Sequence, residues 1–227
     1  MARMTFLDCV QRAYRESGIG GSTGPVTVLS QTGRNADFVK WVQTAFEEIQ
    51  NLRDNWNFAW ATGTFTLTAS VDSYDPVVDF SIAAGVAEWT REGAYVYRPA
   101  SGLSSRLWLG YLEWERFREL PVPPVPGFPN VFSVQPDGLV RYYPKPEQTY
   151  TAVHEYFRNP QALAADTDVP RLPDRFHMAI VWKAVMLYAN FNKDWTLHDS
   201  AEEQYQKIMD GVFEREQGKW TTAGAMA

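Results

Sequence analysis

The chain has 227 residues, 45% of them hydrophobic and 21% charged, which allows a sizeable core and is typical of a folded soluble protein. Its net charge of −6 and sequence pI of about 5.1 disfavour nonspecific DNA binding by an overall basic surface. The single cysteine, Cys9, excludes an intrachain disulfide and a cysteine-based metal cluster.

The N-terminal segment predicts a short amphipathic helix. Thr5 followed three residues later by Asp8 resembles a capping box. Four apolar residues then keep helical spacing, namely Phe6, Val10, Ala13 and Tyr14. Gly18 suits the left-handed residue that ends such a helix. Because the opening sequence lacks the uninterrupted apolar core of a signal peptide, we expect folding in the cytoplasm.

Residues 18–33 are rich in Gly, Ser and Thr and predict a loop. Within it, Gly20 to Gly24 matches G-x-S-x-G, the nucleophile motif of the α/β-hydrolases, with Ser22 as the nucleophile. That motif needs a strand before the serine and a helix after it, whereas here an amphipathic helix precedes it and Pro25 follows. A hydrolase that uses Ser22 is therefore a remote alternative.

A second helix is predicted from Asn35 to Asn55, after which the sequence period changes from helical toward two. Residues 61–160 then indicate an inserted antiparallel β region. Its predicted elements are a strand around Phe65 and Leu67, a short helix at Tyr111–Leu120, a rigid loop at Pro121–Pro129, a hairpin that turns at Asp137-Gly138, and a strand at Thr149–Phe157.

The stretch Asp174–Asn192, DRFHMAIVWKAVMLYANFN, predicts a helix that is buried on most of its circumference. Between Phe176 and Phe191, Lys183 is the only acidic or basic residue besides His177. The stretch is too short and too interrupted to span a bilayer, so packing partners must surround it. The last helix, Leu197–Gln217, should fold back against it as an αα-hairpin.

Together these patterns predict an α+β fold. Residues 1–60 and 170–217 would form an antiparallel helical bundle, and residues 61–160 would form the inserted antiparallel β domain. Residues 218–227 have no regular period and predict a flexible C-terminal tail.

No pattern in the sequence specifies catalysis. His154, His177 and His198 are scattered, without the spacing that gathers metal ligands, and His177 is expected to be a hydrogen-bonded structural residue. The glycines near residue 20 follow a helix instead of a strand, unlike those of a dinucleotide-binding motif. We therefore predict a protein that is not an enzyme and uses no metal or cofactor.

Four blocks of the sequence occur in an order shared with a known family, namely MTFLDCVQRAYRESGI, QTG-x3-DFVKWVQTAFEEIQNL, VFSVQPDGLVRYYPKP and VPRLPDRFHMAIVWKAVMLYA, followed by a closing amphipathic helix. In these blocks the chain resembles the tailed-bacteriophage adaptor family, which comprises head-to-tail connector or head completion proteins. The resemblance extends from Met4 to about Gln217. The family has no catalytic motif to transfer.

The resemblance implies a structural virion protein that forms a ring, typically of twelve copies, beneath the portal. The ring would lie in the neck of the virion, after assembly in the host cytoplasm and without a membrane. It would extend the channel, let genomic DNA pass without sequence-specific contact, and present a platform to the next neck or tail protein. The alternative is another neck or tail ring protein, such as a tail terminator.

The resemblance also implies roles for parts of the chain. The three long helices would supply the subunit core and the ring contacts, and an aromatic share of 15%, with nine tryptophans, suits such packing. The β domain with its 121–129 loop would face neighbours or the next neck protein. The candidate residues for subunit packing are Trp41, Phe176, Trp182, Tyr188 and Phe191. Those for docking the tail on the portal are Lys219, Trp220, Thr221 and Thr222.

Overall fold

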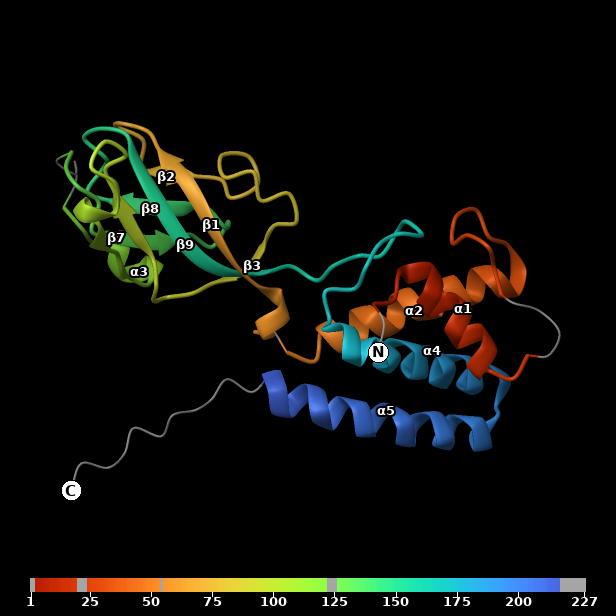
Figure 1. Cartoon of the computed structure of the whole chain (residues 1–227). Coiled ribbons are helices and arrows are strands. Elements are labelled where there is room, and N and C mark those ends of the chain that lie inside the picture. The colour runs from red at the N-terminus through yellow and green to blue at the C-terminus, as the bar shows by residue number, and fades with distance from the viewer. Residues whose placement is uncertain (1–2, 20–23, 54, 122–125, 217–227) are drawn as a thin grey trace, which may run out of the picture. The chain divides into compact units, whose positions relative to one another are not determined.

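The computed structural model describes residues 3–19, 24–53, 55–121 and 126–216, and the chain divides into two compact units. The helical unit comprises the described residues up to Phe58 and from Pro160 onward, and the β unit comprises Ala59–Asn159 (Figure 1). Within the described residues, five α-helices and two mainly antiparallel sheets confirm the predicted α+β class.

The helical unit is organised around α4 (His177–Asn192). This helix contacts α1 (Phe6–Glu16), α2 (Gly33–Gln50) and α5 (Trp195–Glu216), and α5 runs back alongside it (Figure 1). The buried residues of α4 are His177, Ala179, Ile180, Val181, Ala184, Val185, Met186 and Ala189. The predicted burial of this helix is confirmed, and its partners are helices of the same chain.

The start of α1 has the predicted capping box. The Thr5 hydroxyl accepts a hydrogen bond from the Asp8 N–H (3.2 Å), and the Asp8 carboxylate accepts one from the Thr5 N–H (2.9 Å). Two of the backbone donors at the helix start are thereby satisfied. After the helix, Gly18 takes the left-handed conformation with φ of +70°, as its position predicts.

The second helix is shorter than predicted, because α2 ends at Gln50 and not at Asn55. The indole N–H of Trp56 donates to the Gln50 carbonyl (2.9 Å), and the Gln50 side chain bonds to both backbone groups of Gln161 (2.7 and 3.1 Å). These side-chain hydrogen bonds take the place of the backbone hydrogen bonds that would form if the helix continued past Gln50. Leu52, which lies beyond the end of α2 but within the predicted helix, is 51% exposed.

His177 is fully buried at the first position of α4. Its Nδ1 accepts a hydrogen bond from the Met4 N–H (3.1 Å), and its Nε2 donates to the Leu172 carbonyl (2.7 Å). A backbone N–H can only donate and a carbonyl can only accept, so both ring nitrogens have defined roles. This confirms the predicted structural function, and it fastens the N-terminal segment and the loop before α4 to the central helix.

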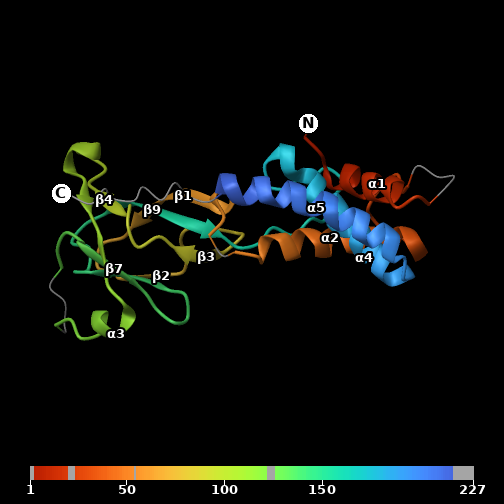
Figure 2. The same cartoon turned by 90° about the horizontal axis from the view of Figure 1, so that it is seen from below.

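The β unit contains two sheets, and its longest strand, β9, lies between β1 and β3 (Figure 2). The first sheet consists of β1 (Trp60–Leu67), β9 (Tyr150–Arg158), β4 (Tyr95–Tyr97) and β5 (Leu107–Trp108), with β3 (Val86–Trp89) also on β9. The second consists of β2 (Ser73–Tyr74), β8 (Val140–Tyr143), β7 (Val131–Val134) and β6 (Gly110–Tyr111).

Three local features of the β unit can be compared with the sequence predictions. The predicted hairpin is confirmed, since β7 and β8 pair antiparallel and Gly138 in the turn has φ of +89°. Among the described strands the predicted antiparallel pairing holds except for β6, which pairs parallel with β7. The predicted helix at Tyr111–Leu120 is reduced to α3 (Trp114–Phe117).

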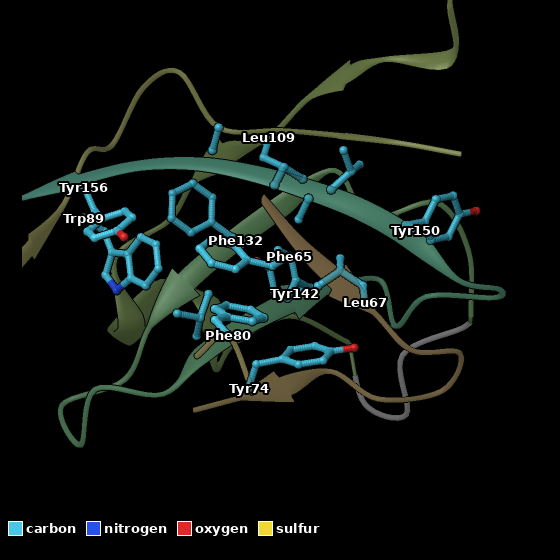
Figure 3. Packing of buried hydrophobic residues seen from close by; sticks show 14 of the residues in the cluster. Phe65, Leu67, Tyr74, Phe80, Trp89, Leu109, Phe132, Tyr142, Tyr150 and Tyr156 are labelled. Atoms are coloured by element: carbon cyan, nitrogen blue, oxygen red, sulfur yellow. The ribbon is translucent and has the colours of Figure 1, made fainter. Parts of the chain in front are cut away.

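Aromatic side chains fill the core of the β unit (Figure 3). Phe65 stacks on Phe80 with ring centroids 4.1 Å apart, and Trp89 lies edge-on against Phe65 at 6.2 Å. Along β1 the side chains alternate as expected for a half-buried strand, because Phe65 and Leu67 are buried while Thr64 and Thr66 are exposed. The β unit thus has a core of its own.

Candidate interaction surfaces

Four aromatic rings from α2 and α4 pack into one cluster that leads from the core of the helical unit to its surface. Phe38 stacks on Tyr188 with centroids 5.2 Å apart. Trp41 lies 5.1 Å from Phe38, 5.6 Å from Tyr188 and 5.7 Å from Phe191. Phe38 is completely buried, whereas Phe191 is 71% exposed. The outermost ring is therefore held in place by its neighbours and still open to a partner.

A second large aromatic side chain is exposed where the chain reverses between α4 and α5. Lys193 ends α4 in the left-handed conformation, with φ of +58°. Trp195, which opens α5, is 62% exposed. We call Phe191 and Trp195, the exposed aromatic side chains on either side of this turn, the aromatic turn surface. Exposed Trp and Phe side chains on a well-defined backbone are typical anchors of protein interfaces.

Lys183 explains how a charged residue fits in the central helix. Its ammonium group lies 2.9 Å from the Glu48 carboxylate of α2 and 5.6 Å from the ring of Tyr205 on α5. The side chain therefore contacts both neighbouring helices. Burial raises the pKa of the Tyr205 hydroxyl, and the Glu48 charge raises it further.

The structure separates the five candidate packing residues into groups. Trp41, Tyr188 and Phe191 belong to one cluster, as described above. Trp182 is half-buried on α4. Phe176 is only 7% exposed, and the Arg175 guanidinium covers its ring at 4.5 Å. The isolated chain therefore already encloses Phe176.

Several sequence predictions concern residues that lie outside the described part of the chain. These are the tail residues Lys219, Trp220, Thr221 and Thr222, and the serine of the hydrolase motif, Ser22. Conversely, sequence reasoning missed Trp195 because it started the last helix two residues later. The large apolar side chain of Trp195, at the first position of the helix, was the sequence feature that could have identified it.

In the β unit, a groove of about 520 Å³ runs beside β3. Apolar side chains of Val77, Val86, Trp89 and Leu139 line it together with charged side chains of Asp75, Glu88, Arg91 and Asp137. Within the described residues β3 pairs only with β9, so its other edge is available for a further strand. The groove and this edge together suit an extended peptide better than a small molecule.

Arginine side chains cover aromatic rings on the first sheet of the β unit. The Arg106 guanidinium lies 4.7 Å from the ring of Trp108 and 5.4 Å from that of Tyr95. Trp108 is 54% exposed, so this pair forms part of the outer surface. Arg with Trp or Tyr is the commonest composition of interface hot spots.

The described residues provide no arrangement suited to nucleophilic catalysis. Cys9 is completely buried, and burial raises the pKa of its thiol to about 12, so the reactive thiolate does not form at neutral pH. His154 is buried among aromatic rings and bonds to Tyr142, while His177 is occupied by backbone groups. None of the described helices is long and apolar enough to cross a bilayer.

Comparison with known proteins identifies the family. The sequence model of the family described as SU10 adaptor protein matches residues 4–227, which is nearly the whole chain. A search of the curated proteins gave no match. The family match confirms the resemblance to tailed-phage adaptors that the four sequence blocks indicated. The chain therefore belongs to the SU10 adaptor protein family, a family of phage head–tail adaptors.

Proposed function

We propose that copies of this protein assemble into a ring, of twelve copies, between the portal and the next neck or tail protein. Membership of the adaptor family makes the chain a structural protein of the virion that interacts with portal and tail proteins. The ring, its copy number and its place in the DNA channel are our proposal. It needs no catalytic group, metal or cofactor.

The observation that carries the proposal is the aromatic turn surface. A ring requires a heterologous interface, in which one surface of each subunit contacts a different surface of the next. Phe191 and Trp195 are 71% and 62% exposed, and large exposed aromatic side chains are stabilised when a neighbouring subunit covers them. We infer that α1, α2, α4 and α5 act as one antiparallel bundle that presents this surface, with Trp41, Trp182 and Tyr188 beneath or beside it.

The charge of the protein supports passage of DNA through the ring. With a net charge of −6, a ring of these chains would not neutralise DNA phosphates and would not hold the duplex by counterion release. The proposal therefore includes genomic DNA as a passing partner, without sequence-specific contact.

The two ends of the ring would contact different proteins. We assign the β unit, with its groove beside β3, to the next neck or tail protein, because an unpaired strand edge next to an apolar groove can accept an extended segment. We assign portal docking to Lys219, Trp220, Thr221 and Thr222. Deleting the residues after Gln217 should leave folding intact and abolish portal binding, and unchanged binding would remove this assignment.

The deciding experiment is the mass of the protein alone and mixed with its portal, by light scattering after size exclusion. A stoichiometric layer on the portal ring supports the proposal. In the F191S and W195S variants that layer should be lost, because removing an interface anchor costs about 2 kcal/mol or more per contact.

The L52S variant is the matched control, since Leu52 is also an exposed apolar residue of the helical unit. It should bind like the wild type. If the protein forms a stable assembly by itself and does not bind the portal, the alternative function as another neck or tail ring protein, such as a tail terminator, would be favoured. Equal loss in the variants and the control would show that the aromatic turn surface has no special role.

A further inference from the structure

Three metal-ligating side chains converge at the start of α5. We propose that His198, Asp199 and Glu202 bind a divalent transition-metal ion, with Zn²⁺ as the ion to test. Their donor atoms all lie within 4.8 Å of one another. The proposal does not depend on the ring, because all three residues belong to one helix of one chain.

The distances suit a metal of this class. The His198 Nδ1 lies 3.4 Å from an Asp199 carboxylate oxygen and 3.9 Å from a Glu202 carboxylate oxygen. In a tetrahedral zinc site, bond lengths near 2.1 Å place neighbouring donors about 3.4 Å apart. The His198–Asp199 pair already has this separation, and the two pairs that involve Glu202 lie within 4.8 Å, so a rotation of the exposed Glu202 side chain would bring them to it.

The local structure holds the imidazole in position. Only 18% of the His198 side chain is exposed, and its ring lies edge-on against Trp195 with centroids 6.2 Å apart. The backbone below it is fixed as well, because the Asp194 carboxylate accepts a hydrogen bond from the Leu197 N–H (3.1 Å). The two carboxylates are more exposed, at 80% and 47%, and can adjust to the ion.

The charges around the cluster also favour a cation. Within residues 3–19, 24–53, 55–121 and 126–216, no Lys or Arg forms an ion pair with Asp199 or Glu202. The nearest acid along the helix, Glu203, is instead paired with Lys207 at 2.7 Å. Two carboxylates without a basic partner other than His198 leave negative charge that a divalent ion would balance.

The donor set selects the class of ion. One imidazole nitrogen and two carboxylate oxygens suit Zn²⁺ and its first-row neighbours, whereas Mg²⁺ and Ca²⁺ prefer oxygen ligands alone. Three protein donors leave at least one coordination position for water or for a side chain of another molecule. Since the sequence search considered only the spacing between histidines, it overlooked a His and a Glu at positions i and i+4, which lie on one face of a helix.

The test is calorimetric titration of the full-length protein, without a histidine tag, with Zn²⁺ near neutral pH. We expect one ion per chain, and a loss of affinity of about tenfold or more in both H198A and E202Q, as for removal of a metal ligand. The E203Q variant is the matched control, because it removes a neighbouring acid that is paired with Lys207 and is not part of the cluster, and it should bind as the wild type does.

Circular dichroism would establish that the variants keep their helices, and E202Q guards against misfolding of H198A because Glu202 is half-exposed. Absence of saturable Zn²⁺ binding to the wild type would overturn the proposal. Equal binding by H198A, E202Q and E203Q would overturn it too, because the ion would then lie elsewhere.

Discussion

Acid should destabilise the β unit through His154. This residue is completely buried, with its ring 4.8 Å from that of Phe132 and 5.3 Å from that of Trp89. Its Nε2 shares a hydrogen bond with the Tyr142 hydroxyl (2.8 Å), and its Nδ1 has no hydrogen-bond partner. Burial disfavours the charged ring and lowers the pKa of His154 from 6.5 to about 3.

The direction of the pH effect follows from this shift. The unfolded chain, with a histidine pKa near 6.5, takes up a proton more readily than the folded chain does. Stability is therefore complete above about pH 6.5 and falls as the pH is lowered toward 3. A pH of about 5 lies roughly 1.5 units below the histidine pKa of the unfolded chain. Protonation therefore stabilises the unfolded state, and the free energy of unfolding falls by about 2 kcal/mol.

Urea unfolding of the wild type and of H154Q at about pH 8 and pH 5 measures this effect. Glutamine can still bond to Tyr142 but does not titrate, so it removes the protonation and keeps the polar contact. The wild type should lose about 2 kcal/mol more than H154Q between the two pH values. Hydrogen exchange of the β9 amides assigns the change to the β unit. Identical losses in the two proteins would refute the reasoning.

Two further predictions concern the cap of α1 and the close packing of Gly63 against Phe65. T5A removes the capping hydroxyl of α1 and should lower the free energy of unfolding by about 1 kcal/mol, whereas T32A, at the start of α2 where the side chain makes no capping bond, should change it little. G63A places a methyl group into the Phe65 ring, which must move, and should cost about 1–3 kcal/mol. Urea unfolding checks both, and a T32A loss equal to that of T5A would contradict the capping explanation.

The features that could be predicted from the sequence depend on neighbours along the chain. The capping box needs only Thr5 and Asp8, and the β7–β8 hairpin needs only the turn around Gly138 and the alternation on either side. The end of α2 could not be predicted, because it depends on bonds from Gln50 to Gln161, which is 111 residues away. The parallel pairing of β6 could not be predicted for a different reason, because a strand of two residues has no detectable period.

The candidate packing residues show a similar limit. Periodicity identifies the apolar positions of a helix, but it does not tell which of them the rest of the chain covers. Phe176 and Phe191 lie at opposite ends of the apolar run of the central helix, yet Phe176 is 7% exposed and Phe191 is 71% exposed. The difference arises from Arg175 and the surrounding helical unit at one end and from the open turn before α5 at the other.

The separation into two units bears on how such a chain could join several partners at once. The aromatic core of the β unit is closed around His154, and the core of the helical unit is closed around α4. Phe191 and Trp195 are 71% and 62% exposed, so neither side chain belongs to the core of the helical unit. A subunit that contacts like neighbours with one unit and a different protein with the other can change one contact without destabilising the other.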